Sequence, residues 1–330
     1  MAISVKAPQI NPDQTGINGN FKGQDILSLS QFDQRSLGIL FQHADEMAKL
    51  RKKGTILDLL KGNIVTLLFY EPSSRTFGSF SSSTLRLGGQ TIPIHDAKTS
   101  SSVAKGETLE DTMGVFQTYS DLIVLRHSET GAAANAANAA NVPLINAGDG
   151  IGEHPTQALM DLYTINNRFG TLDNLTVVFA GDMLNGRTVH SVLLGLSLFK
   201  NTTVYLLSPK ILRLSRQHFN LYKERGVKMV EIEKETDLPK DAHVWYWTRV
   251  QKERFTDLNE YERTKNSFIL TKKLVDTYGS DQLILMHPLP RVGEILTEVD
   301  SDSRAIYFRD EIENGVYVRM ALLALILGKL

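Results

Sequence analysis

A polar hexapeptide, Glu71-Pro72-Ser73-Ser74-Arg75-Thr76, follows the apolar run Ile64–Tyr70, which is rich in strand-forming residues. A helix is predicted from Thr76 to Leu87, and Gly88-Gly89 are typical of its C-cap. The first N–H groups of a helix lack partners within it and lie at the positive end of its dipole. Hydroxyl groups and a guanidinium add further donors there, so the hexapeptide indicates a phosphate-binding turn.

A simpler interpretation of this turn is open, because Ser and Thr cap many helices without binding a ligand. Arg75 favours the anion site, since a cation in the first helical turn opposes the dipole unless an anion lies there. The turn also lacks the Gly-rich frame and Gly-Lys pair of a nucleotide-binding P-loop.

The composition limits the class of protein. The 330 residues suggest about two domains, and 42% hydrophobic and 22% charged residues are ordinary for a globular chain. A net charge of -1 favours neither nucleic acid nor an anionic membrane, so any anion site has to be local. The absence of Cys excludes disulfides, thiol nucleophiles and Cys-ligated zinc. With no signal peptide apparent in Met1–Asn20, we expect a cytoplasmic protein.

Predicted strands and helices alternate along the chain, which indicates parallel sheets that bind ligands beyond the carboxyl ends of their strands. Strands are predicted at 64–70, 91–94, 121–125, 142–146, 174–180, 203–207, 228–232, 241–248 and 283–286. Helices are predicted within 27–52 and 76–87, at 109–119, 132–141 and 154–169, from the 181–188 turn to 199, and at 210–225 and 315–330. The polar segment 96–107 is either a surface loop or a mobile lid that brings a Ser and a Lys to an anion.

Polar groups follow six of these strands, and five of the six carry an arginine. They are Arg75, Arg126, His154, Arg187, Arg249 and the turn 287–291. This recurrence predicts a site for an anionic ligand that is built from both halves of the chain.

Several motifs together resemble the aspartate/ornithine carbamoyltransferase family over roughly residues 25–330. They are E-P-S-S-R-T, H-P-T-Q-A-L-M-D-L, G-R-T-V-H, T-R-V-Q-K-E-R and M-H-P-L-P-R-V. The last two resemble the catalytic chains of the aspartate carbamoyltransferases, whereas the ornithine enzymes carry a Cys in place of the first Pro of H-P-L-P. Two residues depart from common family forms: Ser74 stands where Thr is usual, and Phe77 where bacterial relatives often have Arg.

The resemblance implies two doubly wound parallel-sheet α/β domains with the active site between them. Residues 1–153 with 311–330 would bind carbamoyl phosphate, and 154–310 would bind aspartate. The implied reaction is transfer of the carbamoyl group to L-aspartate in pyrimidine biosynthesis, without a cofactor or metal. The family works as a homotrimer with shared active sites, and a regulatory subunit or a multi-enzyme polypeptide is compatible with the sequence.

The resemblance also implies a role for each matching residue. Phosphate would be held by Ser73, Ser74, Arg75 and Thr76. The carbamoyl carbonyl would be polarised by Thr76, Arg126 and His154, which with Arg75 form the expected catalytic set. The carbamoyl amide would contact Gln157 and the backbone carbonyls of Pro288 and Leu289. Aspartate would be bound by Lys105, Arg187, Thr188, Arg249 and Gln251, with Ser101 and Lys105 supplied by the neighbouring subunit.

Three other functions fit the sequence less well. A carbamoyltransferase acting on ornithine is disfavoured, because a guanidinium-rich pocket suits a dicarboxylate rather than a cationic acceptor. A binding protein that has lost turnover is disfavoured by the presence of every expected site residue. A nucleotide-binding dehydrogenase is excluded, because no G-x-G-x-x-G follows a predicted strand.

Overall fold

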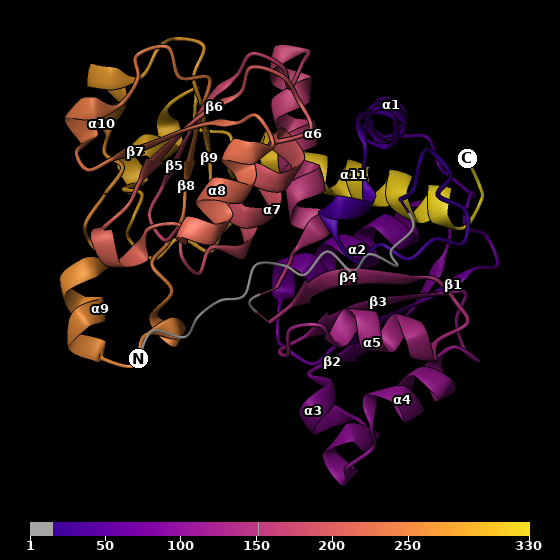
Figure 1. Ribbon diagram of the computed structural model, residues 1–330. Helices are drawn as coiled ribbons and strands as arrows, with labels where there is room; N and C mark the ends of the chain where they lie inside the picture. The colour runs from indigo at the N-terminus through magenta and orange to yellow at the C-terminus, as the bar shows by residue number, and fades with distance from the viewer. Residues whose placement is uncertain (1–15, 151) are drawn as a thin grey trace. The chain divides into compact units, whose positions relative to one another are not determined.

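The computed structural model describes residues 16–150 and 152–330. The chain divides into two compact units (Figure 1). The first unit is the described part of Met1–Tyr163 together with Glu313–Leu330, and the second unit is Thr164–Ile312. The two divisions fall within helices α6, Pro155–Phe169, and α11, Asp310–Ile326.

The first unit contains a four-stranded parallel sheet in the order β2-β1-β3-β4. Every residue of β3 and β4 is buried, as expected for a sheet that helices cover on both faces. The strands are β1 Ile64–Phe69, β2 Gln90–His95, β3 Leu122–His127 and β4 Leu144–Asp149. The helices are α1 Gln34–Lys52, α2 Ser74–Arg86, α3 Ala97–Ser100, α4 Leu109–Phe116 and α5 Ala132–Ala139, with 3₁₀ turns η1 Leu29–Gln31 and η2 Ser102–Lys105.

The second unit contains a five-stranded parallel sheet in the order β7-β6-β5-β8-β9. Both tryptophans of the chain, Trp245 and Trp247, lie on β8 and are fully buried in its core. The strands are β5 Thr176–Ala180, β6 Thr203–Leu207, β7 Lys228–Ile232, β8 Val244–Trp247 and β9 Ile284–Met286. The helices are α7 Arg187–Leu196, α8 Arg216–Glu224, α9 Leu258–Thr264 and α10 Lys272–Tyr278, with 3₁₀ turns η3 Lys210–Leu212, η4 Glu235–Asp237, η5 Lys252–Arg254 and η6 Thr297–Ser301.

Each sheet has one point at which the chain reverses its direction of travel across the sheet. In the first sheet the chain passes from β1 to β2 and then returns to β3 on the other side of β1. In the second it passes from β5 through β6 to β7 and then returns to β8 on the other side of β5. Open α/β sheets bind ligands at such points, outside the carboxyl ends of the strands. The two candidate edges are therefore the carboxyl ends of β1 with β3 and of β5 with β8.

All nine predicted strands are present, and the prediction of parallel sheets is confirmed. The single helix predicted at 210–225 is wrong, because Arg213 has extended backbone and the Ser215 side chain caps a new helix by accepting from the His218 N–H. The segment 96–107 is not an irregular loop, since α3 and η2 occupy most of it. Helices α9 and α10 were not predicted.

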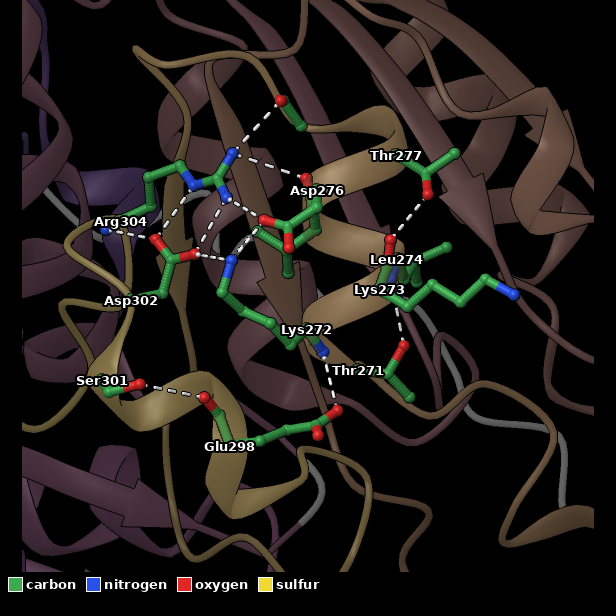
Figure 2. A network of polar contacts seen from close by, with 12 residues as sticks. Thr271, Lys272, Lys273, Leu274, Asp276, Thr277, Glu298, Ser301, Asp302 and Arg304 are labelled. Carbon is green, nitrogen blue, oxygen red and sulfur yellow. Dashed lines mark hydrogen bonds and ion pairs between the residues drawn. The ribbon is translucent and has the colours of Figure 1, made fainter.

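A polar network fastens α10 to the segment that follows η6 (Figure 2). Arg304 Nη1 donates to the carbonyl of Gly279, beyond the end of α10, at 3.1 Å. Its Nη2 donates to Asp302 Oδ2 at 2.8 Å, and the same carboxylate lies 3.4 Å from Lys272 Nζ. These contacts join two segments that the sheet itself does not connect. Within residues 16–150 and 152–330, no helix combines the length and apolar character needed to cross a bilayer.

Candidate active site

The predicted phosphate turn is the N-terminus of α2. Ser73 is the N-cap residue, yet its side chain makes no capping hydrogen bond, so the hydroxyl is not committed to the helix. Ser74 and Arg75 open the first turn and are exposed, whereas Thr76 is buried. Throughout α2, which the structure describes completely, the first turn contains no acidic residue. The turn thus combines helix N–H groups, hydroxyls and a cation without a built-in counter-charge on the same turn.

Phe77 supports this turn from below. Its ring lies 5.2 Å from that of Phe69 on β1 and 5.2 Å from that of His95 on β2, nearly perpendicular to both. Such edge-to-face contacts stabilise the docking of α2 on the sheet. The unusual Phe at this position therefore packs α2 against the two strands.

Arg126 lies at the carboxyl end of β3 and is 8% exposed. Its Nη2 is 2.9 Å from Glu71 Oε2, and its Nη1 donates to the Ala147 carbonyl at 3.1 Å. Burial lowers the pKa of Arg126, while the Glu71 carboxylate acts in the opposite direction. The buried Nε finds no hydrogen-bond partner in the described part of the chain. A buried donor without a partner is costly, so this atom is suited to an oxygen of a bound anion.

His154 is buried immediately before α6, where its carbonyl accepts from the N–H groups of Gln157 at 3.1 Å and Ala158 at 3.2 Å. Pro155 occupies the first helical position, as the sequence predicts. The preceding loop is held by Asp149, which accepts from Gly131 N at 2.8 Å and from Glu153 N at 3.0 Å. The imidazole of His154 thus follows Glu153, whose backbone N–H is bound by Asp149 at the end of β4.

One buried carboxylate joins the two loops at the reversal point of the second sheet. Asp182 accepts from Asn185 N at 2.9 Å in its own loop and from Gln251 N at 3.4 Å in the loop after β8. Burial raises its pKa. Gly181 has φ +115, and a Cβ there would lie 2.1 Å from the Thr248 carbonyl, so only glycine allows the approach of the two loops.

The two arginines of this second edge lie within or directly after those loops. Arg187 is the first residue of α7, followed by Thr188. Arg249 Nη1 donates to Glu253 Oε2 at 3.0 Å, and this pairing raises the pKa of Arg249. Gln251 Nε2 donates to the Asn185 carbonyl at 2.9 Å. The edge presents half-buried guanidinium groups whose planar donor sets match carboxylates.

The turn after β9 is organised by His287. Its Nδ1 accepts from Leu289 N at 2.8 Å, so its Nε2 carries the proton and donates to Glu294 Oε1 at 2.7 Å. Burial lowers the pKa of His287. Leu289 adopts φ +52 and precedes a cis Pro290. The carbonyls of Pro288 and Leu289 are thus part of a turn with a fixed backbone.

Arg291 does not join the other predicted arginines. It forms a two-fold ion pair with Asp300, with Nη2 2.6 Å from Oδ2, and its guanidinium lies 5.0 Å from the centre of the Phe308 ring. Five arginines follow predicted strands. Asp300 and the Phe308 ring give one of them, Arg291, a structural role.

Ser101 and Lys105 lie beyond β2, the edge strand of the first sheet. Ser101 Oγ donates to the Ala97 carbonyl at 2.6 Å and accepts from Val103 N at 3.2 Å, so it caps η2. Lys105 ends η2 and is exposed. Neither residue follows a strand at the two reversal points.

The other predicted site residues follow the strands after which the sequence placed them. The strands that precede Arg75, Arg126 and His154 are neighbours in the order β1-β3-β4. Those that precede Arg187, Arg249 and Pro288 are neighbours in the order β5-β8-β9. Sequence reasoning missed the carboxylates that position these groups, although each lies in or beside a predicted motif. They are Glu71, Asp149, Asp161, Asp182, Glu253 and Glu294.

Residues 24–167 match the carbamoyl-phosphate-binding domain of the aspartate/ornithine carbamoyltransferases, and residues 173–326 match their aspartate/ornithine-binding domain. The chain belongs to the aspartate/ornithine carbamoyltransferase family. Within that family, a chloroplastic aspartate carbamoyltransferase of Arabidopsis thaliana is 45% identical over 93% of this chain and 78% of the relative. The aspartate carbamoyltransferase catalytic subunit of Hyperthermus butylicus is 44% identical over 95% and 99% of the two chains.

Two further carbamoyltransferase relatives extend this comparison. The multifunctional protein pyr1-3 of Dictyostelium discoideum is 45% identical over 96% of this chain, which spans 14% of that protein. An aspartate transcarbamoylase from Trypanosoma cruzi, solved with carbamoyl phosphate and aspartate, superposes with a TM-score of 0.87. It is 37% identical and aligns over 94% of this chain and 98% of its own.

Proposed function

We propose that the chain transfers the carbamoyl group of carbamoyl phosphate to L-aspartate, giving N-carbamoyl-L-aspartate and phosphate in de novo pyrimidine biosynthesis. Membership of the family and similarity to named aspartate carbamoyltransferases support the reaction. The observation that carries it is that one unit holds a phosphate turn and the other holds arginines whose donors suit carboxylates. Carbamoyl phosphate is assigned to residues 1–153 with 311–330, and aspartate to 154–310.

On the carbamoyl phosphate side, the phosphate takes the N-terminus of α2 with the side chains of Ser73, Ser74, Arg75 and Thr76. The carbonyl oxygen accepts from Thr76, Arg126 and His154. The carbamoyl amide contacts Gln157 and the carbonyls of Pro288 and Leu289. The unpaired Nε of Arg126 supports this assignment, because the ligand supplies the acceptor that the folded chain lacks.

On the aspartate side, Arg187 and Arg249 bind the two carboxylates, with Thr188 and Gln251 beside them. A guanidinium carries five N–H donors, so Arg249 can bind a carboxylate of aspartate through the donors that Glu253 does not take. A cationic acceptor such as ornithine gains nothing from this arrangement. The contact of Arg249 with Glu253 supports the assignment, because the arginine is already oriented before aspartate binds.

The reaction needs only positioned donors. The neutral amine of aspartate attacks the carbamoyl carbon, an N–C bond forms, and charge develops on the carbonyl oxygen. The C–O bond to phosphate then breaks, and the departing phosphate takes the proton that the amine loses. Donors fixed around the carbonyl oxygen stabilise the charge, and one such donor contributes about 2.7–4 kcal/mol to lowering the barrier.

The deciding experiment measures ureido-product formation from carbamoyl phosphate with L-aspartate or with L-ornithine. We expect turnover with aspartate alone. Turnover with ornithine alone contradicts the role of the arginines, and binding of carbamoyl phosphate without any turnover favours a binding protein. For the compartment, cell fractionation tests the expected cytoplasmic location against a plastid, the compartment in the name of the Arabidopsis relative.

We also propose a homotrimer in which Ser101 and Lys105 complete the site of the neighbouring subunit. The outer face of α2 supports this, because a shallow groove there is lined by Phe77, Gly78, Ser81, Ser82, Leu85 and Arg86. A second copy seated on that groove would lie beside the phosphate turn at the start of the same helix. Because one relative is a multifunctional protein, association of this chain with further enzymes is a second hypothesis to test.

Mixed trimers test the sharing of sites. Lys105→Ala and Arg75→Ala chains are each expected to be inactive alone, whereas trimers reassembled from both regain part of the activity through sites without either substitution. Reassembly of the wild-type chain serves as the control. Mixed trimers that never regain activity contradict shared sites.

A further inference from the structure

A buried polar relay in the first unit consists of the side chains of Arg319, Asp161 and Gln157. Gln157 Nε2 donates to Asp161 Oδ1 at 3.0 Å, one helical turn further along α6. Asp161 is fully buried. The guanidinium of Arg319 on α11 is 3% exposed and interacts electrostatically with the Asp161 carboxylate. The three side chains therefore form a chain from a buried cation through a buried anion to an amide.

Arg319 is placed by contacts on several sides. Its Nη1 donates to Ser79 Oγ at 3.0 Å and to the Gly315 carbonyl at 3.2 Å, and lies 3.6 Å from Met160 Sδ. The guanidinium also lies 5.2 Å from the centre of the Phe80 ring. None of these partners is an anion, so Asp161 is the group whose charge balances Arg319.

The hydrogen bond to the Asp161 carboxylate fixes the orientation of the Gln157 amide. A carboxylate can only accept hydrogen bonds, so the amide must turn its NH₂ group toward Asp161. The amide oxygen then points away from Asp161 and is available as an acceptor. A protonated or uncharged partner would allow the reverse orientation, with the NH₂ group pointing away.

We propose that Arg319 and Asp161 are positioning residues that make Gln157 selective for an acyl phosphate bearing an N–H donor. This inference rests on the proposed function, in which Gln157 contacts the carbamoyl amide. The relay presents an oxygen acceptor to the carbamoyl NH₂ group. Acetyl phosphate, which carries a methyl group at that position, leaves the acceptor without a partner. A site built to hydrogen-bond one substrate rejects an analogue that lacks the group.

The test compares kcat/KM for carbamoyl phosphate with kcat/KM for acetyl phosphate, both at saturating aspartate. Asp161→Asn permits the reversed amide, and we expect it to lower this ratio about tenfold or more, since a misplaced polar group leaves a buried partner unsatisfied. The KM for aspartate is expected to stay within about twofold, because the proposed role of Asp161 is to orient the amide that binds carbamoyl phosphate. Gln157→Ala is expected to lower the ratio similarly.

A double-mutant cycle separates positioning from general damage. In the Gln157→Ala background, Asp161→Asn is expected to cause no further loss of the ratio, because the amide it orients is absent. An unchanged ratio in Asp161→Asn, or full additivity with Gln157→Ala, overturns the relay. An unchanged ratio in Gln157→Ala overturns it as well. Failure of the wild-type chain to carbamoylate aspartate is a separate result that overturns the proposed function.

A second pair of variants covers the case in which Asp161→Asn does not fold. Arg319→Lys keeps the buried charge and is expected to keep most of the selectivity, whereas Arg319→Gln removes the charge and is expected to lower it. Far-UV circular dichroism and binding of inorganic phosphate, which reads the α2 turn rather than Gln157, verify that each variant is folded. Equal selectivity in the two variants overturns the relay.

Discussion

The carboxyl edges of the two sheets handle positive charge in different ways. At the first edge, the buried Arg126 keeps one donor without a protein partner, and Arg75 opposes the dipole of its own helix. At the second edge, Arg249 is paired with Glu253, and the loops are tied by the buried Asp182. The first edge thus holds one buried donor atom, Arg126 Nε, without a protein partner, whereas Arg249 at the second edge is paired beforehand. Substitutions at the first edge should therefore affect the barrier, and those at the second mainly aspartate binding.

The largest expected effect is at the first edge. Arg75→Ala removes a donor to the phosphate and is expected to lower kcat by about 10²–10³-fold in a folded protein. Steady-state ureido formation measures it. Arg35→Ala is the matched control, since Arg35 is an exposed arginine in the first turn of another helix, α1, and we expect kcat within about twofold of wild type. Wild-type turnover in a folded Arg75→Ala chain contradicts the role of the turn.

Two buried groups, one in each unit, should respond to acid with opposite signs. In the second unit, burial lowers the pKa of His190 to about 4, and His190 Nε2 is 2.8 Å from the Met183 carbonyl in the loop before Arg187. In the first unit, burial raises the pKa of Glu153, which accepts from Leu29 N at 3.0 Å. A lowered folded-state pKa means that the unfolded chain binds more protons, and a raised one means that the folded chain does.

The second unit should therefore lose stability as the pH falls from about 6.5 toward 4, by about 3 kcal/mol for His190 alone. The contribution of Glu153 is fully present below its unfolded pKa and is lost as the pH rises through the folded one. Because both tryptophans lie in the second unit, fluorescence during urea unfolding at several pH values reports that unit, while circular dichroism reports both. His190→Gln keeps a donor for Met183 and should flatten the pH dependence. A fluorescence transition that is independent of pH contradicts this account.

The sequence alone predicts only part of this difference between the two sheet edges. Motif order placed a phosphate turn and several arginines after strands, because Gly, Pro and Ser mark strand ends clearly. It could not show that β1, β3 and β4 are neighbours, since strand order depends on long-range pairing. Nor could it show that Asp300 engages Arg291, because a surface carboxylate nine positions away carries no recognisable pattern. Glu71 and Glu253, which pair with Arg126 and Arg249, stand within the motifs themselves, but a motif does not show which of its side chains meet in space.

A smaller effect is expected for Glu253→Gln at the second edge. The substitution removes the ion pair that orients Arg249, and we expect the KM for aspartate to rise about two- to fivefold, because half-exposed pairs contribute little. The KM for carbamoyl phosphate should not change. Glu262→Gln is the control, since Glu262 forms a comparable ion pair with Lys265 on α9. An equal rise in both KM values would show that the two edges do not divide the substrates.

The smallest effect is expected for Lys272→Met in the network of Figure 2. Lys272 is half-exposed and pairs with Asp276 and with Asp302, so the midpoint of thermal unfolding and both KM values should remain within error. Arg304→Met is the contrasting variant, because it removes the side-chain donor to the Gly279 carbonyl and to the buried Asp302, and it should lower the midpoint while both KM values stay unchanged. A change in the KM for aspartate in either variant would mean that any cation–carboxylate pair of the second unit tunes aspartate binding. Aspartate binding would then not depend specifically on the pair of Arg249 and Glu253.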